Sequence, residues 1–571
     1  MFATDKTKTG EKRAANRPEL ESSRPHVLTI SLEEYFHGGA LARVVLSKHW
    51  DRFESRIDKS VDEALALLRN YDAKATFFVL GVLADRNPGI VSRIVNAGHE
   101  VASRGFWPRG IAGMTQDEFV EDLDRTAAVI EAAGGGKVRG YRAPRWIQPD
   151  DLWILEVLAQ KGYAYDASIN PIGWPLRWAK DFHTVRRHRL GQLSLPGQSG
   201  SIVEVPVSTA SVGGFRAAIA GGNWMRQLPH GLMSRLVARW DRRREDPLVF
   251  YLTSWELDPD QPQITAASRW SSMRHYRNLW RTRWRFEQYL NRYRFVSVGE
   301  HLGLPATKPH QPVKPRVDSR PIAEITVGEP KRSAKVQKVS VIVPMYNEQD
   351  NIPYLLRTLS TVAARTYDRY ELELVFVDDC SRDDTWGVLQ RASEGRDDIK
   401  LVRHEKNMGV AAALMTGARA ASADIVCSID CDCSYDPMDL QEMVPLLSDA
   451  DMVTASPYHP LGQVLNVPRW RLFLSRGLSM LYRRTLRADL YTWTSCFRVW
   501  RRDKLAEIEL EHKDFLGVAE MVVRLLRRGG TVREFPTMLE SRLLGTSKMK
   551  TLKTILGHLG LLWQVVRRRI S

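Results

Sequence analysis

The chain has 571 residues, too many for a single hydrophobic core, so its length predicts two domains joined by a linker. Hydrophobic residues make up 43% and charged residues 26% of the chain, which is typical of globular proteins. Because no run of about 18 uncharged apolar residues is present, we expect no transmembrane helix. The net charge of +16 favours anionic partners such as phospholipid or phosphorylated substrates. No basic stripe with interleaved aromatic residues occurs, and nucleic acid is therefore not expected as a partner.

The amino-terminal stretch 1–25 is polar and lacks the apolar segment of a secretory signal, so we interpret it as a disordered tail. All five cysteines fall in the second half of the chain, without the paired spacing of a zinc site. This usage favours reduced thiols in a cytoplasmic protein over a disulfide framework.

Residues 26–302 alternate short apolar runs with amphipathic segments, the pattern of a parallel α/β domain. We expect strands at Val27–Ile30, Ala75–Leu80, Val203–Val207 and Leu248–Leu252, and helices at Val61–Arg69 and Asp117–Ala132.

Seven segments of this stretch carry a resemblance to a known family. In chain order they are HVLTISLEEYFH, KATFFVLG, HEVASRGFWP, GYRAPRW, YDASINP, EVPVST and FYLTSWELDPDQP. Together they resemble the polysaccharide deacetylase family, which implies a distorted (β/α) barrel of fewer than eight strands over 26–302.

The catalytic pattern of that family is degenerate here. Its members bind a divalent metal through an acidic residue near the first strand and through two histidines, whose positions hold Arg104 and Pro108. Ser31 stands where the base aspartate is expected, and Thr253 where a late histidine is expected. Guanidinium has no lone pair to give a metal, so we expect no cofactor in this domain and predict a pseudoenzyme for binding or docking. Of the family pattern, Glu33 and Glu34 remain, as do Arg142, Asp166 and Glu256.

Residues 303–337 are rich in proline and basic residues and show no sustained apolar period. Such a segment buries too little surface to order itself, so we predict a linker between the two domains.

The second stretch contains three near-continuous apolar runs, expected to be strands covered on both faces: Val339–Val343, Leu374–Val377 and Ile425–Ile429. Acidic residues follow each run: Glu348 after the first, Asp378 and Asp379 at the end of the second, and Asp430 and Asp432 after the third. A single acidic pair after a strand commonly caps the following helix, but three sets at successive strand ends favour a site for Mg²⁺ or Mn²⁺ bridging to a diphosphate.

The ordered motifs of this stretch resemble family 2 glycosyltransferases, and within them the polyprenyl-phosphate branch. The motifs are VSVIVPMYNEQDNI, VDDCSRDDT, NMGVAAALMTGARAA, SIDCDCSYDPMDL, SCFRVWRRD and SRLLGTSKMK. The resemblance covers 338–550 and implies a Rossmann-like α/β fold that binds nucleotide sugars.

Carried over position by position, the resemblance implies roles for named residues. Metal ligation is implied for Asp430 and Asp432, and catalytic roles for Asp432, Glu520, Arg542 and Lys548. Contacts with the nucleotide sugar are implied for Pro344, Tyr346, Glu348, Asp378, Asp379, Asp430, Arg498 and Ser547. Two structural alternatives stay open: an ion pair of Arg498 with Asp489, and a helix-face salt bridge for Glu520.

The last segment, 551–571, spaces apolar residues as a helix does and ends in arginines, and Trp470–Arg487 is a second stretch of this kind. Both are typical of interfacial helices on an anionic membrane surface, and equally of helices docked on the catalytic domain.

The leading hypothesis is an inverting transferase that moves a sugar from a nucleoside diphosphate sugar to a polyprenyl phosphate or similar acceptor. We expect it in the cytoplasm, peripheral on the inner face of the membrane. A lipid phosphate is already anionic, so direct displacement needs no strong base. The alternatives are a bifunctional deacetylase and glycosyltransferase, and a non-enzymatic glycan-binding scaffold.

Overall fold

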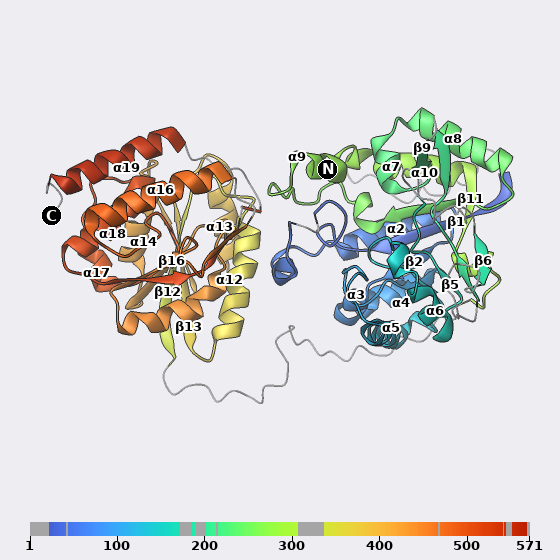
Figure 1. Ribbon diagram of the computed structural model, residues 1–571, viewed down its shortest axis with the longest axis horizontal. Coiled ribbons are helices and arrows are strands. Elements are labelled where there is room, and N and C mark those ends of the chain that lie inside the picture. Colours follow the sequence, from blue (N-terminus) through green and yellow to red (C-terminus); the bar gives the residue numbers. More distant parts are fainter. Residues whose placement is uncertain are drawn as a thin grey trace, which may run out of the picture. The chain divides into compact units, whose positions relative to one another are not determined.

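The computed structural model describes residues 22–41, 44–171, 185–189, 201–212, 215–306, 336–465, 469–540, 542–543 and 551–567. The chain divides into two compact units, each an α/β layer structure (Figure 1). The first unit comprises Met1–Arg43, Ser55–Pro262 and Arg269–Ser319, and the second comprises Val44–Glu54, Gln263–Ser268 and Arg320–Ser571. Two short segments of the first three hundred residues thus group with the second unit.

The first unit is built on a nine-stranded sheet with the order β10-β1-β2-β3-β4-β5-β7-β6, in which β11 also pairs with β1. Every pairing is parallel except that of β6 with β7. The strands are β1 (Ser22–Leu32), β2 (Thr76–Val79), β3 (Glu100–Ser103), β4 (Gly140–Tyr141), β5 (Tyr165–Asp166), β6 (Arg186–Arg189), β7 (Ser201–Glu204), β10 (Val249–Thr253) and β11 (Tyr293–Val296), with a separate hairpin of β8 (Thr209–Val212) and β9 (Phe215–Ala218). The result is an incomplete barrel.

Helices line the outside of this sheet (Figure 1). They are α2 (Ile57–Asn70), α3 (Gly81–Arg86), α4 (Pro88–Asn96), α5 (Gln116–Ile130), α6 (Ile154–Gln160), α7 (Gly222–Gln227), α8 (His230–Arg243), α9 (Arg269–Tyr276), α10 (Thr282–Arg292) and α11 (Val298–His301). Helix α5 begins where Thr115 accepts a hydrogen bond from the backbone N–H of Glu118, whose carboxylate in turn accepts one from the backbone N–H of Thr115. Its buried residues, Phe119, Leu123 and Ile130, recur at helical spacing and join the main core.

Several expectations for this unit need correction. The sheet has nine strands where the family resemblance implied fewer than eight, since β11 pairs beside β1 and the antiparallel β6 extends the edge at β7. The charged run Arg186–Arg189 forms an antiparallel partner that only β7 could specify. Strand β7 begins at Ser201 and ends at Glu204, earlier than the expected Val203–Val207, and β1 begins inside the predicted tail.

The second unit contains a seven-stranded sheet with the order β14-β13-β12-β15-β18-β16-β19. Strand β18 is antiparallel to both of its neighbours, and the other pairings are parallel. The strands are β12 (Gln337–Met345), β13 (Tyr370–Asp378), β14 (Ile399–Arg403), β15 (Ile425–Ser428), β16 (Met452–Ser456), β18 (Arg498–Arg501) and β19 (Val532–Pro536), and a small parallel pair is formed by β17 (Gln463–Leu465) and β20 (Met538–Glu540).

Helices cover both faces of this sheet, as its apolar strands predicted. They are α12 (Ile352–Thr366), α13 (Thr385–Ser393), α14 (Val410–Ala420), α15 (Leu440–Met443), α16 (Arg469–Leu486), α17 (Arg502–Ala506), α18 (Phe515–Arg527) and α19 (Thr551–Val566). Alternate residues of β12 enter different cores: Val341 and Val343 pack with residues of α12, whereas Ile342 packs with residues of α14 and α18. The two faces together position the loops that follow β12, β13 and β15.

Candidate active site

The three acidic motifs of the second unit meet at one edge of its sheet. Strand β12 pairs in parallel with both β13 and β15, and Met345, at the end of β12, lies opposite Asp378. The carboxyl ends of parallel strands lie at the same edge, where ligands bind in open α/β sheets. The sequence-based expectation that these loops converge is confirmed.

Arg542 joins two of the motifs. Its Nε donates to Asp432 Oδ2 at 2.6 Å, and its Nη2 lies 3.3 Å from Glu348 Oε1. The other oxygen of Asp432 accepts hydrogen bonds from the backbone N–H and the hydroxyl of Ser434, at 2.9 and 2.7 Å. Burial alone would lower the pKa of Arg542, but the two carboxylates outweigh it and raise the pKa above its usual range. The guanidinium is thus held charged at the sheet edge.

Asp430 lies beside this cluster and lacks comparable neutralisation. Burial, and then the charge of Asp432, raise the pKa of Asp430 to about 7. A pair of adjacent carboxylates in this state fits a divalent cation, which supplies the missing positive charge and prefers oxygen ligands. Within the described ranges, no three histidine, cysteine, aspartate or glutamate side chains gather closely enough to hold a metal ion. Two carboxylates leave most coordination positions of such a cation for phosphate oxygens and water.

Asp378, the last residue of β13, and Asp379, which follows it, hold loop backbone in place. Asp378 is fully buried, accepts from the backbone N–H of Ser381 and pairs with Arg403 Nε at 3.0 Å. Asp379 accepts from the backbone N–H groups of Met408 and Gly409, each at 2.7 Å. Both carboxylates thus bind groups of the protein itself. Their contacts with a nucleotide stay predictions.

Two further predicted nucleotide contacts, Pro344 and Tyr346, lie at the end of β12 and just beyond it, where both are partly exposed. One residue in each of the three loops adopts a left-handed backbone: Asn347 has φ 54°, Cys380 has φ 60° and Cys433 has φ 50°. Non-glycine residues adopt this conformation rarely, and such strain concentrates at binding sites.

Arg498 begins β18 opposite Ser428, the last residue of β15. Because β18 runs antiparallel, its first residue reaches the same edge as the acidic motifs. The guanidinium is buried, donates to the carbonyl oxygens of Val518 and Trp493 at 2.6 and 2.8 Å, and has a pKa lowered by burial to about 10. The alternative reading of an ion pair with Asp489 is wrong, since Asp489 pairs with Arg483 instead.

The carboxylate of Glu520 also binds groups of the protein itself. Its carboxylate accepts from the backbone N–H groups of Glu511 and His512, at 3.0 and 2.9 Å, and from Arg524 Nε at 2.5 Å. Burial would raise the pKa of Glu520, but these hydrogen bonds outweigh it and lower the pKa. The helix-face salt bridge with Arg524, four residues on, is therefore present, and a role for Glu520 beside the acceptor stays a prediction. Ser547 and Lys548 lie outside the described residues.

In the first unit, Arg104 pairs with Glu33, another of the predicted deacetylase positions. Its Nε and Nη2 donate to Glu33 Oε1 at 2.7 and 2.5 Å, and both side chains are buried. Pro108 is buried as well. Ser31 lies opposite Thr253 across the pairing of β1 with β10, so the base and late-histidine positions are adjacent. The structure thus brings Arg104 to Glu33 and Ser31 to Thr253, and whether these positions can act on a substrate stays a prediction.

The two remaining deacetylase positions are buried structural groups. Arg142 donates to the carbonyl oxygen of Ala167 and to the hydroxyl of Thr29, each at 3.0 Å, and burial lowers its pKa to about 10. Asp166 accepts from the backbone N–H and the hydroxyl of Ser168, at 2.9 and 2.6 Å, and burial raises its pKa.

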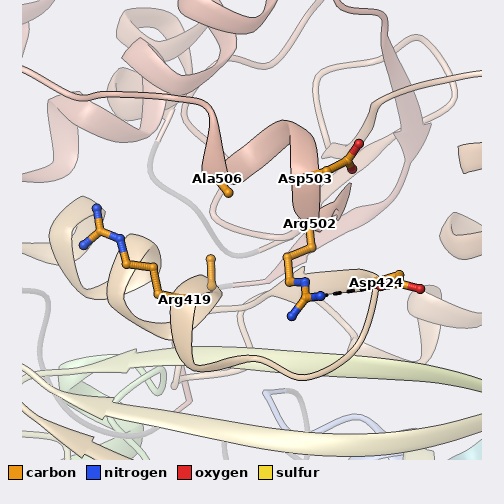
Figure 2. A pocket seen from close by; sticks show the side chains of 6 residues that line it. Arg419, Asp424, Arg502, Asp503 and Ala506 are labelled. Atoms are coloured by element: carbon orange, nitrogen blue, oxygen red, sulfur yellow. Dashed lines mark ion pairs between the residues drawn. The ribbon is translucent and has the colours of Figure 1, made fainter.

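A hollow of about 580 Å³ lies at the opposite edge of the second sheet (Figure 2). It is lined by residues of α14 and α17, and Arg502 reaches to 3.6 Å from Asp424, which immediately precedes β15. Because Asp424 and Asp430 flank opposite ends of β15, this hollow is separate from the acidic motifs.

Sequence reasoning missed a group of residues in Val44–Glu54. Lys48 and His49 contact Glu540, and Arg52 contacts Asp436, which are close in sequence to Arg542 and Asp432 respectively. No motif marks these residues; the only signal is a cluster of basic side chains at helical spacing.

Comparisons with known proteins agree with this division. Residues 340–509 match the glycosyl transferase family 2 model, residues 50–165 match the polysaccharide deacetylase model, and residues 167–303 match a domain of unknown function, DUF3473. Among the described residues, no helix has the length and apolar character needed to cross a membrane.

Two curated relatives resemble the second unit. A dolichol-phosphate mannosyltransferase of Pyrococcus furiosus is 30% identical over 237 residues, which are 40% of this chain and 64% of that protein. The chain thus spans a little less than two thirds of this relative. A polyprenol monophosphomannose synthase of Mycolicibacterium smegmatis is 27% identical over 229 residues, 39% of this chain and 84% of that protein.

A solved structure of glucosyl-3-phosphoglycerate synthase from Mycobacterium tuberculosis, in complex with Mn²⁺, UDP and glucosyl-3-phosphoglycerate, is 18% identical. The match covers 40% of this chain and 80% of that one, with a TM-score of 0.32. On the family matches and the two curated relatives, the second unit contains a family 2 glycosyltransferase domain similar to dolichol- and polyprenol-phosphate mannosyltransferases, and the chain joins it to a polysaccharide deacetylase domain followed by the DUF3473 domain.

Proposed function

We propose that the second unit is a metal-dependent, inverting glycosyltransferase that moves a sugar from a nucleoside diphosphate sugar to a polyprenyl phosphate or similar membrane acceptor. The observation that supports it best is the chain of ion pairs from Asp432 through Arg542 to Glu348 at the sheet edge, beside Asp430. A guanidinium in this position can bind two oxygens of a diphosphate at once, because its donors form a rigid fork.

The chemistry requires a good leaving group more than it requires a base. When bound by Asp430 and Asp432, Mg²⁺ or Mn²⁺ would offset the negative charge that grows on the departing diphosphate. The acceptor's phosphate oxygen forms a bond to the anomeric carbon while the bond from that carbon to the diphosphate oxygen breaks. The nucleoside diphosphate leaves with the electron pair, and the configuration inverts. Arg542 stabilises the same charge, and no proton has to be removed from an anionic phosphate.

The protein's carboxylates are consistent with this scheme. Asp379 and Glu520 each accept three or more hydrogen bonds from protein groups, so neither is poised as a general base. A direct displacement by an oxygen that is already anionic needs none.

The test uses the purified full-length chain with Mn²⁺, a panel of labelled nucleotide sugars and a polyprenyl phosphate, and measures labelled lipid product. Asp432→Asn should lower turnover at least about 100-fold, because it removes both a metal ligand and the partner of Arg542. The matched control is Asp424→Asn, an exposed carboxylate at the opposite edge, which should turn over like the wild type. The proposal is wrong if no nucleotide sugar yields a lipid product, or if Asp432→Asn retains full turnover.

We further propose that α16 and α19 form the membrane-facing surface of this unit, at the inner face of the membrane. The two helices are neighbours (Figure 1), joined by a hydrogen bond of 2.9 Å between Tyr482 and His558. Both expose large apolar side chains: Phe473 at 78%, Met480 at 70%, Leu556 at 62% and Trp563 at 48%. Exposed arginines accompany them, namely Arg476, Arg484, Arg487 and Arg567. Apolar side chains beside basic ones match the chemistry of an anionic bilayer surface.

For the first unit we propose a pseudoenzyme that binds or docks a glycan without hydrolysing it. The supporting observation is the buried pair of Arg104 with Glu33, which puts a permanent cation where metal ligands are expected. Metal analysis of the purified chain and an acetate-release assay on acetylated sugars test this. Stoichiometric zinc that survives Asp432→Asn, together with released acetate, would establish a bifunctional enzyme instead.

A further inference from the structure

The segment Val44–Glu54 belongs to the second unit although more than 280 residues separate it from β12. We call it the clasp. Its centre is a single 3₁₀ helix, Ser47–Arg52, in which His49 and Arg52 are buried. A short basic helix buries such groups only when acidic partners receive them, so its partners indicate what the clasp does.

The first partner is Glu540, the last residue of β20. Lys48 Nζ lies 2.9 Å from Glu540 Oε1, and His49 Nε2 lies 2.9 Å from Glu540 Oε2. Arg52 Nη1 lies 3.0 Å from His49 Nδ1. Since arginine only donates, Nδ1 of His49 accepts and its Nε2–H donates to Glu540. Both oxygens of Glu540 are thus occupied by the clasp.

The second partner is Asp436, in the loop after β15. Arg52 Nη2 donates to Asp436 Oδ1 at 2.6 Å. Burial would raise the pKa of Asp436, but the charge of Arg52, the hydrogen bonds from Met438 and Arg52 and the charge of Lys48 together lower it. On the other side of the clasp, Phe53 packs against Tyr354 of α12, with ring centroids 5.1 Å apart. Arg52 therefore reaches the loop after β15 directly and the end of β20 through His49.

These two partners flank the proposed catalytic groups. Asp436 follows Asp432 in the same loop, and Glu540 precedes Arg542 on the segment that leaves β20. A hydrogen bond of 2.9 Å from the backbone N–H of Glu540 to the carbonyl oxygen of Ser434 joins the same two elements. Beyond Arg542, the carbonyl oxygen of Leu543 accepts from the backbone N–H of Thr265 at 2.8 Å. Thr265 lies in Gln263–Ser268, the other early segment of the second unit.

We propose that Lys48, His49 and Arg52 are positioning residues for glycosyl transfer: they fix the Arg542 segment against the loop that carries Asp432. With Thr265, the clasp holds Arg542 from both sides. The transfer site is then completed by parts of the chain that lie outside the family 2 region. The clasp also packs on α12, but a packing role alone would not require its ion pairs to fall on the two carboxylates that flank the catalytic pair.

This inference rests on the proposed function for its kinetic readout only. A guanidinium displaced by about 1 Å can lower turnover by about 100-fold, so loss of the clasp should affect turnover more than donor binding. Arg52→Ala removes the buried cation that donates to Asp436 and contacts His49; Lys48, which lies 3.7 Å from Asp436 and 2.9 Å from Glu540, is left in place. Arg52→Lys keeps the charge but cannot donate in two directions from one rigid plane, and should restore part of the effect. Arg93→Ala is the matched control, since Arg93 makes only exposed ion pairs in the first unit.

The first measurement is hydrogen exchange of the full-length variants. In Arg52→Ala, peptides covering 538–543 should exchange at least about tenfold faster than in the wild type, while peptides of β12 stay protected. In Arg93→Ala both regions should match the wild type. If peptides 538–543 of Arg52→Ala exchange as slowly as those of the wild type, the clasp is dispensable and the inference is overturned. If peptides of β12 speed up as much as peptides 538–543, the clasp supports the fold in general, and the inference is overturned as well.

The second measurement is turnover with Mn²⁺ and each nucleotide sugar that the wild type uses. Arg52→Ala should lose about tenfold or more in kcat with a donor KM within about threefold, and Arg52→Lys should lie between it and the wild type. An unchanged kcat overturns the positioning role. If the wild type makes no product, the proposed function fails while the exchange experiment still decides whether the clasp positions the Arg542 segment.

Discussion

Replacing Arg104 with alanine tests most directly whether the buried ion pair of Arg104 with Glu33 stabilises the first unit. The guanidinium and the carboxylate of Glu33 are both buried, with side-chain exposures of 5% each, and two nitrogens of Arg104 contact one oxygen of Glu33. Arg104 also donates to the carbonyl oxygen of Pro144 at 3.2 Å. Arg104→Ala removes the cation and leaves a buried carboxylate without compensation.

The magnitude follows from this burial. Removing one partner of a buried pair costs about 3–5 kcal/mol, mainly through the uncompensated charge. For a unit of roughly 250 residues, each kcal/mol shifts the melting temperature by about 2–4 °C. The first unit of Arg104→Ala should therefore melt about 6–20 °C below that of the wild type. The double variant Glu33→Gln with Arg104→Met removes both charges and should recover most of this loss.

Differential scanning calorimetry of the full-length chain is suited to this test, because we expect each of the two compact units to give its own unfolding transition. Only one transition should move in Arg104→Ala, and Mn²⁺ with nucleoside diphosphate, which should bind the second unit, identifies the other by raising it. A melting temperature of Arg104→Ala within about 2 °C of the wild type would refute the reasoning. So would a double variant that is less stable than Arg104→Ala.

Three further outcomes are expected. Arg542→Ala should lower turnover at least about 100-fold with little change in melting temperature, and a loss below tenfold would contradict its role at the diphosphate. Phe473→Glu should weaken co-sedimentation with anionic vesicles about tenfold or more, whereas Leu461→Glu, an equally exposed leucine outside α16 and α19, should not; equal losses would remove α16 from the membrane surface. The buried Glu373 should make stability depend on acid: burial opposes ionisation, but Ser340, Ser422 and Lys400 lower its pKa from 4.5 to about 2. Its contribution is therefore complete above pH 4.5 and lost as pH falls toward 2, so urea titrations of Glu373→Gln should show a shallower acid loss, by about 3 kcal/mol, than those of the wild type.

The sheet of the second unit could be predicted because its signal is local. Buried parallel strands need apolar side chains on both faces, and the runs at Val339–Val343 and Ile425–Ile429 have them, so β12 and β15 were found nearly at their bounds. The convergence of the acidic loops followed from parallel pairing alone. The same reasoning could not reveal that β18 runs antiparallel between β15 and β16, since strand direction is set by the path of the chain and not by the four residues Arg498–Arg501.

The binding partners of individual carboxylates were harder to predict than their positions at the ends of strands. Asp379 and Asp432 both follow strands, yet Asp379 holds the backbone before α14 while Asp432 holds Arg542. The difference depends on backbone N–H groups about thirty residues away, which no local pattern specifies. The same limit applies to Glu520, whose partners are set by the turn at Glu511 and His512.

His49 and Glu540 lie 491 positions apart in the chain, so they leave the ribosome at very different times during synthesis. At a synthesis rate of about 5–20 residues per second, Glu540 emerges from the ribosome roughly 25–100 s after His49. For that interval His49 cannot bind Glu540, although much of the first unit can already fold and Asp436, the partner of Arg52, emerges earlier. Completion of the transfer site therefore has to wait until Glu540 has emerged, and an mRNA truncated before codon 540 would yield a chain that lacks both Glu540 and Arg542.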